Sequence, residues 1–184
     1  ASSILDAAEQ KIYDIRQGKD TGGPTKVSEV IVNGVYDRLG KLTGEDKEKY
    51  KGIPTGFGLL DTYITGLNKS DFILIGARPA MGKTSFALNL ASNVSMMARK
   101  KCVFFSLEMT KEQLAERLLA SQAGVPSHKL RTGELDNDEW VRLGNAAGQF
   151  NDVELYLDDT SSITVPEIKS RVRRMKDVDV IMID

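Results

Sequence analysis

The chain has 184 residues, 41% of them apolar, and its 25 basic and 26 acidic side chains leave a net charge of −1. This length suffices for one α/β core with an appendage, and the balanced charge excludes a protein that covers nucleic acid through its overall charge. Because the single cysteine excludes an internal disulfide, and no stretch has the length of a membrane span or the pattern of a secretion signal, we expect a soluble cytoplasmic protein without a membrane partner.

The first part of the chain is expected to form two amphipathic helices with a spacer between them. Apolar residues recur at helical spacing over 1–17, and a glycine-rich polar segment, 18–25, follows as a linker. A second helix should begin near Ser28, which suits an N-cap, and end before Gly44. Its apolar face consists of Ile31, Val35, Leu39 and Leu42. Neither helix has a core of its own, so each must pack either on the same chain or on a neighbouring subunit, and both options stay open.

The stretch from Phe72 to Ala91, FILIGARPAMGKTSFALNLA, has the pattern of a phosphate-binding loop. An apolar run that predicts a strand breaks into a glycine-bearing loop and restarts as a helix. Gly82, Lys83 and Thr84 match the end of the Walker A loop, whereas Ala77 stands at the position of its usual first glycine. Alanine still fits the exit from a strand into a loop, so this departure leaves the prediction in place.

This loop predicts the binding of a nucleoside triphosphate with Mg²⁺. Successive backbone N–H groups from Ala80 to Thr84 are expected to form an anion-binding nest at the positive end of the helix. Lys83 would reach the β- and γ-phosphates, and the Thr84 hydroxyl would bind the Mg²⁺ that bridges them. The nucleotide-binding residues expected from the loop are Ala80, Met81, Gly82, Lys83, Thr84 and Ser85.

Beyond the loop, strands and helices are expected to alternate. Apolar runs predict strands at 103–106, 153–159 and 178–184. Three pairs of residues with capping-box spacing predict the starts of helices: Thr110 with Gln113, Asp136 with Glu139, and Thr164 with Glu167. This alternation is typical of a parallel sheet that helices cover on both faces.

Two acidic residues at strand ends complete the expected site. Asp184 ends the last apolar run, as a Walker B aspartate does, and would support the magnesium shell at the carboxyl edge of the sheet. Glu108 follows the strand at 103–106, where its carboxylate could activate the water that attacks the γ-phosphate. An equally good interpretation is that Glu108 only favours the dipole of the helix behind it. Because a parallel sheet that ends on a central strand would leave an open apolar edge, we expect the chain to be a fragment of a longer protein.

The remaining charged and reactive side chains have plainer interpretations. Cys102 lies in the apolar run CVFFS and is expected to pack in the core, and His128 has no metal-ligand companions and is expected at the surface. A cluster of five basic residues near the end of the chain is expected to face solvent rather than a phosphate. These residues are Lys169, Arg171, Arg173, Arg174 and Lys176.

Several stretches resemble successive motifs of the DnaB-type replicative helicases, whose motor has a RecA-like fold. They are GARPAMGKTSFALNLA, FSLEMTKEQLAERLLA, KLRTGELDNDEW, LYLDDTSSITVPEIKSRVRRMK and IMID, and IPTGFGLLD is similar to the start of that motor. The resemblance implies a RecA-like P-loop NTPase: an α/β fold with a mainly parallel sheet covered by helices on both faces, preceded by an α-helical linker arm. Residues 1–17 would end the N-terminal domain or open the linker, 18–52 would form the linker with its amphipathic helix, and 53–184 would be the N-terminal part of the ATPase domain.

The resemblance also implies a function. A homohexameric ring would hydrolyse ATP at its subunit interfaces, translocate on single-stranded DNA and unwind the duplex at the bacterial replication fork on the nucleoid, with a helicase loader and primase as partners. Lys83 and Glu108 would be catalytic, Thr84 and Asp184 would hold Mg²⁺, with Asp184 acting through water, and the fragment alone would be weakly active or inactive. Two alternatives stay open: a RecA-type recombination ATPase, which shares the loop and the glutamate, and a catalytically incomplete nucleotide-binding assembly module.

Overall fold

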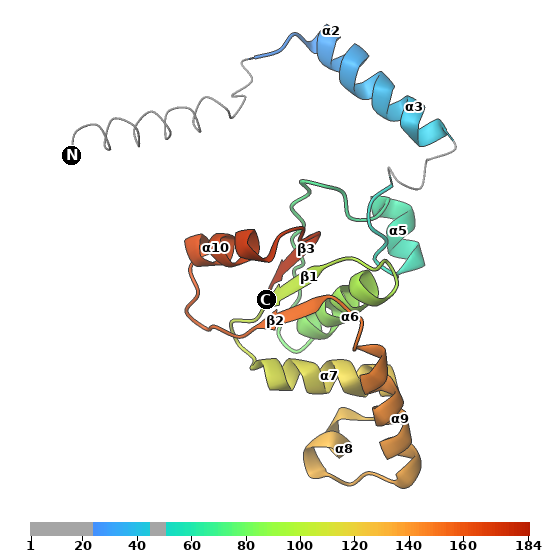
Figure 1. Ribbon diagram of the computed structural model, residues 1–184, viewed down its shortest axis with the longest axis vertical. Coiled ribbons are helices and arrows are strands. Elements are labelled where there is room, and N and C mark those ends of the chain that lie inside the picture. Colours follow the sequence, from blue (N-terminus) through green and yellow to red (C-terminus); the bar gives the residue numbers. More distant parts are fainter. Residues whose placement is uncertain (1–23, 45–50) are drawn as a thin grey trace, which may run out of the picture. The chain divides into compact units, whose positions relative to one another are not determined.

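The computed structural model describes residues 24–44 and 51–184 (Figure 1). They belong to two compact units that divide between Lys51 and Gly52. The expected helix over 1–17 and most of the spacer at 18–25 lie outside the described residues. Of the helices that are described, none is long and apolar enough to cross a membrane.

The N-terminal unit contains one continuous run of helical turns. It consists of α2 (Val27–Val30), a π-helical stretch η1 (Ile31–Tyr36) and α3 (Asp37–Thr43). The predicted helix is confirmed, but Lys26 occupies the N-cap and Ser28 lies in the first turn, so the predicted cap is wrong. None of the described residues of this unit is buried, and Ile31 and Leu39 are 42% and 50% exposed. The helix therefore presents an apolar face that the described residues of its unit do not cover.

The second unit is built around a parallel sheet with three strands among the described residues. β1 (Cys102–Phe105) lies between β2 (Leu155–Asp158) and β3 (Val180–Ile183). Within the register, Phe104 is level with Leu157 on one side and Met182 on the other. The carboxyl ends of β1 and β3 therefore lie side by side, and the predicted parallel sheet is confirmed together with three of its strands.

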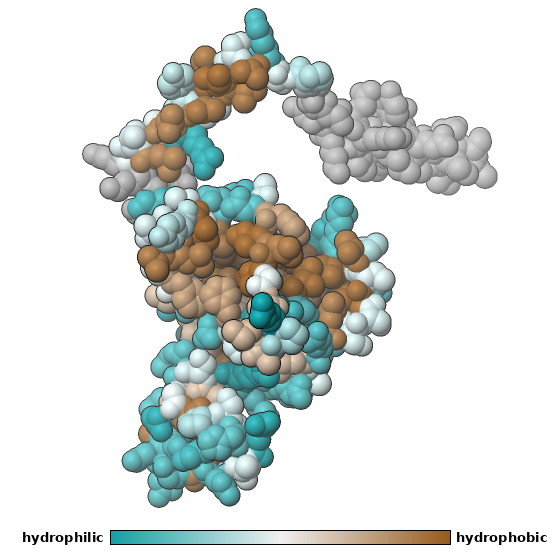
Figure 2. Space-filling model, turned by 180° about the vertical axis from the view of Figure 1, so that it is seen from behind, coloured by the Kyte–Doolittle hydropathy of each residue, from teal (hydrophilic) through white to brown (hydrophobic). Residues whose placement is uncertain are grey.

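The apolar run ahead of the loop does not form the strand that the sequence predicts. Residues 71–78 take no regular secondary structure, and Phe72 and Leu74 are 91% and 84% exposed. A strand is stabilised by hydrogen bonds to a neighbouring strand, and among the described residues β3 pairs with β1 alone. The predicted strand is therefore wrong for this structure: residues 71–78 do not pair with the free edge of β3, and a run with high β-propensity stays irregular when it makes no such pairing. Figure 2 shows broad apolar surface on this unit, whose exposed residues include Phe72, Leu74, Ile181 and Ile183.

Helices approach both faces of the sheet. On one face, α6 (Lys83–Met96) and α7 (Lys111–Ala123) enclose the main core. That core contains Leu90, Val94, Cys102, Phe104, Leu114 and Leu118, so the predicted core position of Cys102 is confirmed. Burial raises the pKa of the Cys102 thiol to about 12, so the thiol stays protonated and unreactive. On the other face, α10 (Val165–Met175) is attached through an ion pair with the end of β2.

That ion pair corrects one prediction about the basic cluster. Arg171 pairs with Asp158 and donates a hydrogen bond of 2.9 Å to Thr160 Oγ1, so it does not face solvent as expected. Burial would raise the pKa of Asp158, but the hydrogen bonds from Arg171 and Thr160 outweigh it and hold that pKa below its usual value. The other four basic residues are exposed as predicted: Lys169, Arg173, Arg174 and Lys176.

The predicted capping boxes begin three of the helices. Thr110 and Gln113 start α7, and Asp136 and Glu139 start α9 (Asn137–Gln149). At α10 the N–H and hydroxyl of Thr164 both donate to the Glu167 carboxylate, at 2.8 and 2.7 Å. Between α7 and α9, α8 (Ser127–Thr132) helps to enclose a second, smaller core, and His128 is exposed as predicted.

A clamp ahead of the loop holds α6 in place. Thr55, which is fully buried, donates its N–H and its hydroxyl to Asp61 of α5 (Gly58–Ile64), at 2.9 and 2.8 Å. Its carbonyl accepts a hydrogen bond of 3.0 Å from Asn93 Nδ2 on α6. A Cβ at Gly56, where φ is +78°, would lie 2.5 Å from the Asn93 side chain, so only glycine fits. The clamp fixes the C-terminal half of α6, and because the helix is rigid this also fixes the orientation of its first turn.

Candidate functional site

The turn before α6 leaves the first turn of that helix open to an anion. Gly82 is the N-cap, with φ of +87°, and Ala80 also has a positive φ of +62°. A Cβ at Gly82 would meet nothing within 4 Å, so the backbone conformation rather than lack of space favours glycine there. Gly82 has no side chain that could accept from the first-turn N–H groups, which have no acceptor within the helix. The helix start therefore provides donors for a negatively charged ligand.

Met81 plays a different part from its neighbours in the loop. Its N–H donates to the carbonyl of Arg78 at 3.2 Å, so this amide closes the turn. Its side chain is 73% exposed. The Arg78 side chain is exposed as well, so the loop carries one apolar and one charged side chain at its surface.

The start of α6 and the end of β3 meet at one carboxylate. Lys83 Nζ lies 2.9 Å from Asp184 Oδ1, and the Thr84 hydroxyl donates to Asp184 Oδ2 at 2.6 Å. The Asp184 side chain is 6% exposed, whereas that of Lys83 is 42% exposed. Backbone hydrogen bonds of 2.9 Å, from Asp184 N–H to the Phe105 carbonyl and from Leu107 N–H to the Asp184 carbonyl, hold the aspartate at the sheet edge. The structure thus joins the loop to a residue that lies 100 positions beyond Thr84 in the sequence.

The charges around Lys83 keep it protonated. The hydrogen bond with Asp184 and the negative charge of that carboxylate raise the pKa of Lys83, partial burial lowers it slightly, and the charge of Glu108 raises it further. Lys83 is therefore a cation at neutral pH, suited to a phosphate. Because its side chain is largely exposed, water screens this attraction.

Glu108 stands beside this group without touching it. It is exposed in the short segment between β1 and α7, and its charge acts on Lys83. Two hydrogen bonds fix the segment: Leu107 N–H donates to Asp184, and Met109 N–H donates to the Ser106 hydroxyl at 3.0 Å. The backbone that carries Glu108 is therefore fixed at the carboxyl edge of the sheet, near the phosphate loop.

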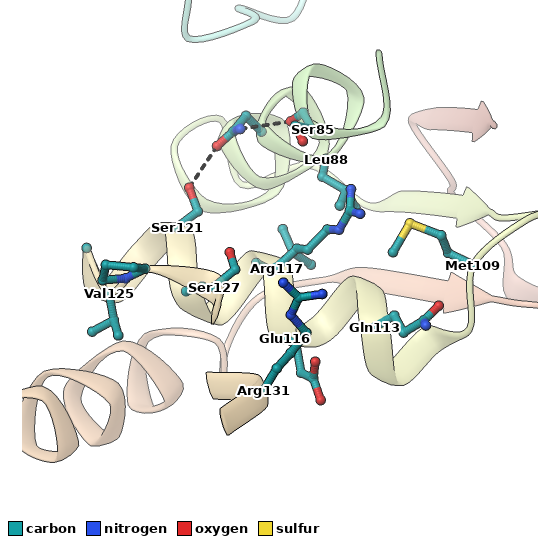
Figure 3. A pocket seen from close by; sticks show the side chains of 15 residues that line it. Ser85, Leu88, Met109, Gln113, Glu116, Arg117, Ser121, Val125, Ser127 and Arg131 are labelled. Carbon is teal, nitrogen blue, oxygen red and sulfur yellow. Dashed lines mark hydrogen bonds between the residues drawn. The ribbon is translucent and has the colours of Figure 1, made fainter. Parts of the chain in front are cut away.

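A groove begins beside the loop and runs between α6, α7 and α8 (Figure 3). Its volume is about 750 Å³. Ser85 and Asn89 line it from α6, Gln113 and Arg117 from α7, and Arg131 from α8. In Figure 3 the Arg117 side chain extends from α7 toward α6. The groove lies next to the anion-binding turn, not over it, so a ligand held at both places must be elongated.

Hydrogen bonds set the shape of this groove. Asn89 Nδ2 donates to the Ser85 carbonyl at 2.8 Å, and the Ser121 hydroxyl donates to Asn89 Oδ1 at 3.1 Å, which ties α6 to α7. Ser85 was expected at the site from the loop motif, whereas Gln113 was expected only as a capping residue and Arg117 was not singled out. Their signal was their i, i+4 spacing, which puts both on one side of the helix that follows Glu108.

The oxygen atoms at the loop suit a hard divalent cation. Thr84 supplies a hydroxyl and Asp184 a carboxylate, the ligand types that Mg²⁺ prefers. Within 24–44 and 51–184 there is no group of three or more His, Cys, Asp or Glu residues that could hold a metal by itself. A fully protein-made cage is therefore absent from the described part, whereas Mg²⁺ normally uses one or two protein oxygens together with phosphates and water.

Comparisons with known proteins agree with this arrangement. Residues 52–184 match the family described as "DnaB-like helicase C terminal domain". The chain is 39% identical over 173 residues to the replicative DNA helicase DnaB of Geobacillus stearothermophilus, covering 94% of this chain and 38% of that relative. It is 41% identical over 177 residues to the replicative DNA helicase DnaB of Pasteurella multocida, again covering 94% and 38%. The chain therefore spans about two fifths of the length of these curated relatives.

Solved structures give the same result for the fold. The "ATPase Domain of G40P" superposes with a TM-score of 0.75 at 30% identity, covering 88% of this chain and 57% of that one. A DnaB-like replicative helicase, whose structure was described with its interactions with primase, superposes with a TM-score of 0.77 at 28% identity, covering 98% and 43%. The predicted RecA-like α/β fold class is confirmed.

Proposed function

The chain belongs to the family of DnaB-like helicase C-terminal domains, and we propose on this basis that it carries the nucleotide-binding site of an ATP-driven replicative DNA helicase. The observation that supports the proposal most directly is the meeting of Lys83, Thr84 and Asp184, with Glu108 alongside. Family membership favours the helicase over the recombination ATPase that shares the loop. The full activity belongs to a longer protein, since the relatives extend well beyond the matched region.

In this proposal the start of α6 binds the phosphates of ATP. The first-turn N–H groups and the Lys83 ammonium neutralise the β- and γ-phosphates, and Gly82 lets the chain approach them closely. Thr84 and Asp184 hold Mg²⁺, which when bound neutralises and bridges the same phosphate oxygens. Ser85 then lies where the phosphate chain continues into the groove.

The groove takes the ribose and base. Its volume of about 750 Å³ lies in the range of small-molecule pockets, and its position next to Ser85 suits the part of a nucleotide beyond the α-phosphate. Arg117 is planar at its guanidinium and can stack on an aromatic base, and the side-chain amide of Gln113 can hydrogen-bond with its edge.

Glu108 is the proposed base for hydrolysis. The segment around it is anchored near the loop, and among the described contacts the Glu108 carboxylate makes no hydrogen bond that would occupy it. It can therefore accept a proton from water, or orient that water, beside a γ-phosphate bound to Lys83.

The ring and its partners are part of the proposal. We infer a homohexamer that moves on single-stranded DNA, with a helicase loader and primase as partners; the primase inference is drawn from the solved relative that interacts with primase. The apolar face of the helix over 27–43, which the described residues of its unit leave exposed, favours docking on the motor unit of a neighbouring subunit. The proposed site of action is the bacterial replication fork.

We predict that Lys83→Ala weakens the binding of ATP with Mg²⁺ roughly 10- to 100-fold, the effect of losing one charge-assisted hydrogen bond. The fold should persist, because the Lys83 side chain is 42% exposed. Isothermal titration calorimetry measures the affinity, and Lys100→Ala, which removes a lysine of similar exposure far from the loop, is the control. Parental affinity in Lys83→Ala would contradict the loop assignment.

Arg117→Ala should weaken the binding of ADP roughly 3- to 30-fold, the range from an exposed to a desolvated cation–π contact, and leave the binding of inorganic pyrophosphate unchanged. This difference arises because pyrophosphate contains the phosphate part of the ligand and lacks the base. Competition against a fluorescent nucleotide measures both affinities, with Arg173→Ala on α10 as the control. Equal losses for ADP and pyrophosphate would show that Arg117 does not contact the base.

Glu108→Gln should separate binding from hydrolysis. Glutamine keeps the size of the side chain but cannot take a proton, so we expect the ATPase rate of the full-length ring to fall roughly 10²- to 10⁴-fold. ATP affinity should stay near that of the parent. Glu112→Gln, in the first turn of α7, is the control: it removes another negative charge from the same helix start and should leave the ATPase rate near that of the parent. If Glu108→Gln retains the parental rate, Glu108 has only its helix-dipole role.

Placing aspartate at both Ile31 and Leu39 should dissociate full-length hexamers at a protein concentration where the parent is assembled. A charge in an apolar contact loses hydration without gaining a partner. Sedimentation velocity measures the assembly, and Asn33→Asp adds charge at a polar position of the same helix as a control. An unchanged mass would show that this face packs on its own chain.

A further inference from the structure

One carboxylate holds both side chains that the proposed site needs for its ligand. Asp184 binds the Lys83 ammonium at 2.9 Å through one oxygen and the Thr84 hydroxyl at 2.6 Å through the other. A phosphate that approaches the loop must therefore compete with Asp184 for Lys83.

The two partners differ in how far they can move. Asp184 is 6% exposed and is fixed by backbone hydrogen bonds to Phe105 and Leu107, whereas Lys83 is 42% exposed on a long flexible side chain. Lys83 is consequently the partner that leaves. Its departure would strand a nearly buried carboxylate without its cation, next to a ligand that is itself negative, and this is unfavourable.

We propose that Asp184 is a metal-released latch on the phosphate loop: it retains Lys83 until a divalent cation arrives with the nucleotide and replaces the lysine as its counter-charge. This inference rests on the proposed nucleotide site and deepens it. The cation has the same two oxygen-bearing side chains at its disposal, Thr84 and Asp184, that the latch uses. A nucleotide without metal brings no cation to replace Lys83 beside Asp184, so it must break the ion pair in order to bind and binds more weakly.

The latch differs from a plain metal ligand in one measurable respect. If Asp184 only binds metal, its removal weakens the binding of Mg²⁺-nucleotide and leaves the binding of metal-free nucleotide unaffected. If Asp184 also retains Lys83, its removal strengthens the binding of metal-free nucleotide, because Lys83 is then free for the phosphates.

The test is the dissociation constant of ADP for the whole chain, measured by calorimetry in excess EDTA and again in Mg²⁺. Asp184→Asn should bind ADP in EDTA roughly tenfold more tightly than the parent, the scale of one charge-assisted hydrogen bond. The gain in affinity that Mg²⁺ gives should shrink in the same variant. Asparagine keeps an oxygen that can accept from Thr84, and Asp184→Ser is the replacement if circular dichroism shows that Asp184→Asn is unfolded.

Two controls separate the latch from general charge repulsion. Glu108→Gln removes a negative charge that acts on Lys83 without a hydrogen bond to it, so it should give a smaller gain in EDTA. In a Lys83→Met background, Asp184→Asn should increase the affinity for ADP in EDTA by no more than Glu108→Gln does. Unchanged affinity of Asp184→Asn in EDTA, or a gain equal to that of Glu108→Gln, would overturn the latch. Absence of Mg²⁺-ADP binding by the parent would instead overturn the proposed nucleotide site.

Discussion

The position of the phosphate loop depends on how α6 is held, because the segment before the loop gives no support. Residues 71–78 are irregular and exposed, so no hydrogen-bonded strand fixes the loop from its N-terminal side. The helix itself is fixed at two places. Near the C-terminal end of α6, Asn93 is hydrogen-bonded to Thr55. At the start of α6, Lys83 and Thr84 are bound to Asp184. The Asp184 carboxylate thus joins helix to sheet at the proposed binding site, and a ligand that takes over these contacts must also take over their structural role.

The sheet transmits the position of Asp184 to Glu108. The Asp184 N–H donates a hydrogen bond to the Phe105 carbonyl, and the Asp184 carbonyl accepts one from the Leu107 N–H. Glu108 is the residue after Leu107. A shift of the end of β3 therefore moves the segment that carries Glu108. The two are connected directly by hydrogen bonds rather than by a long chain of packed side chains. This short path offers a physical route by which a change at the proposed metal-binding residues reaches the proposed base.

The sequence predicted features that depend on neighbouring residues better than features that depend on a partner elsewhere in the fold. The capping boxes at Thr110 and Asp136 depend on residues three positions apart, and both form as predicted. The strand over 72–76 depends on a pairing partner, which a sequence pattern cannot supply, and it does not form. Arg171 was missed for the same reason, since its partner Asp158 lies on another element 13 residues away. At the site, the motif located Lys83 and Thr84, whereas the groove residue Arg117 becomes visible only once α6 and α7 are packed together.

The exposure of the site bears on whether this chain is an enzyme by itself. Lys83 is 42% exposed and Glu108 is also exposed, so water surrounds both charged groups and weakens their action on a bound phosphate. Stabilisation of the charge that develops during phosphoryl transfer is strongest where water is excluded and the charged groups are fixed. The described residues build the proposed phosphate-binding half of such a site but not the wall that would close it. This openness favours slow turnover for the isolated chain. It also favours a second surface, which a neighbouring subunit of the proposed ring would provide, as the part that converts binding into hydrolysis.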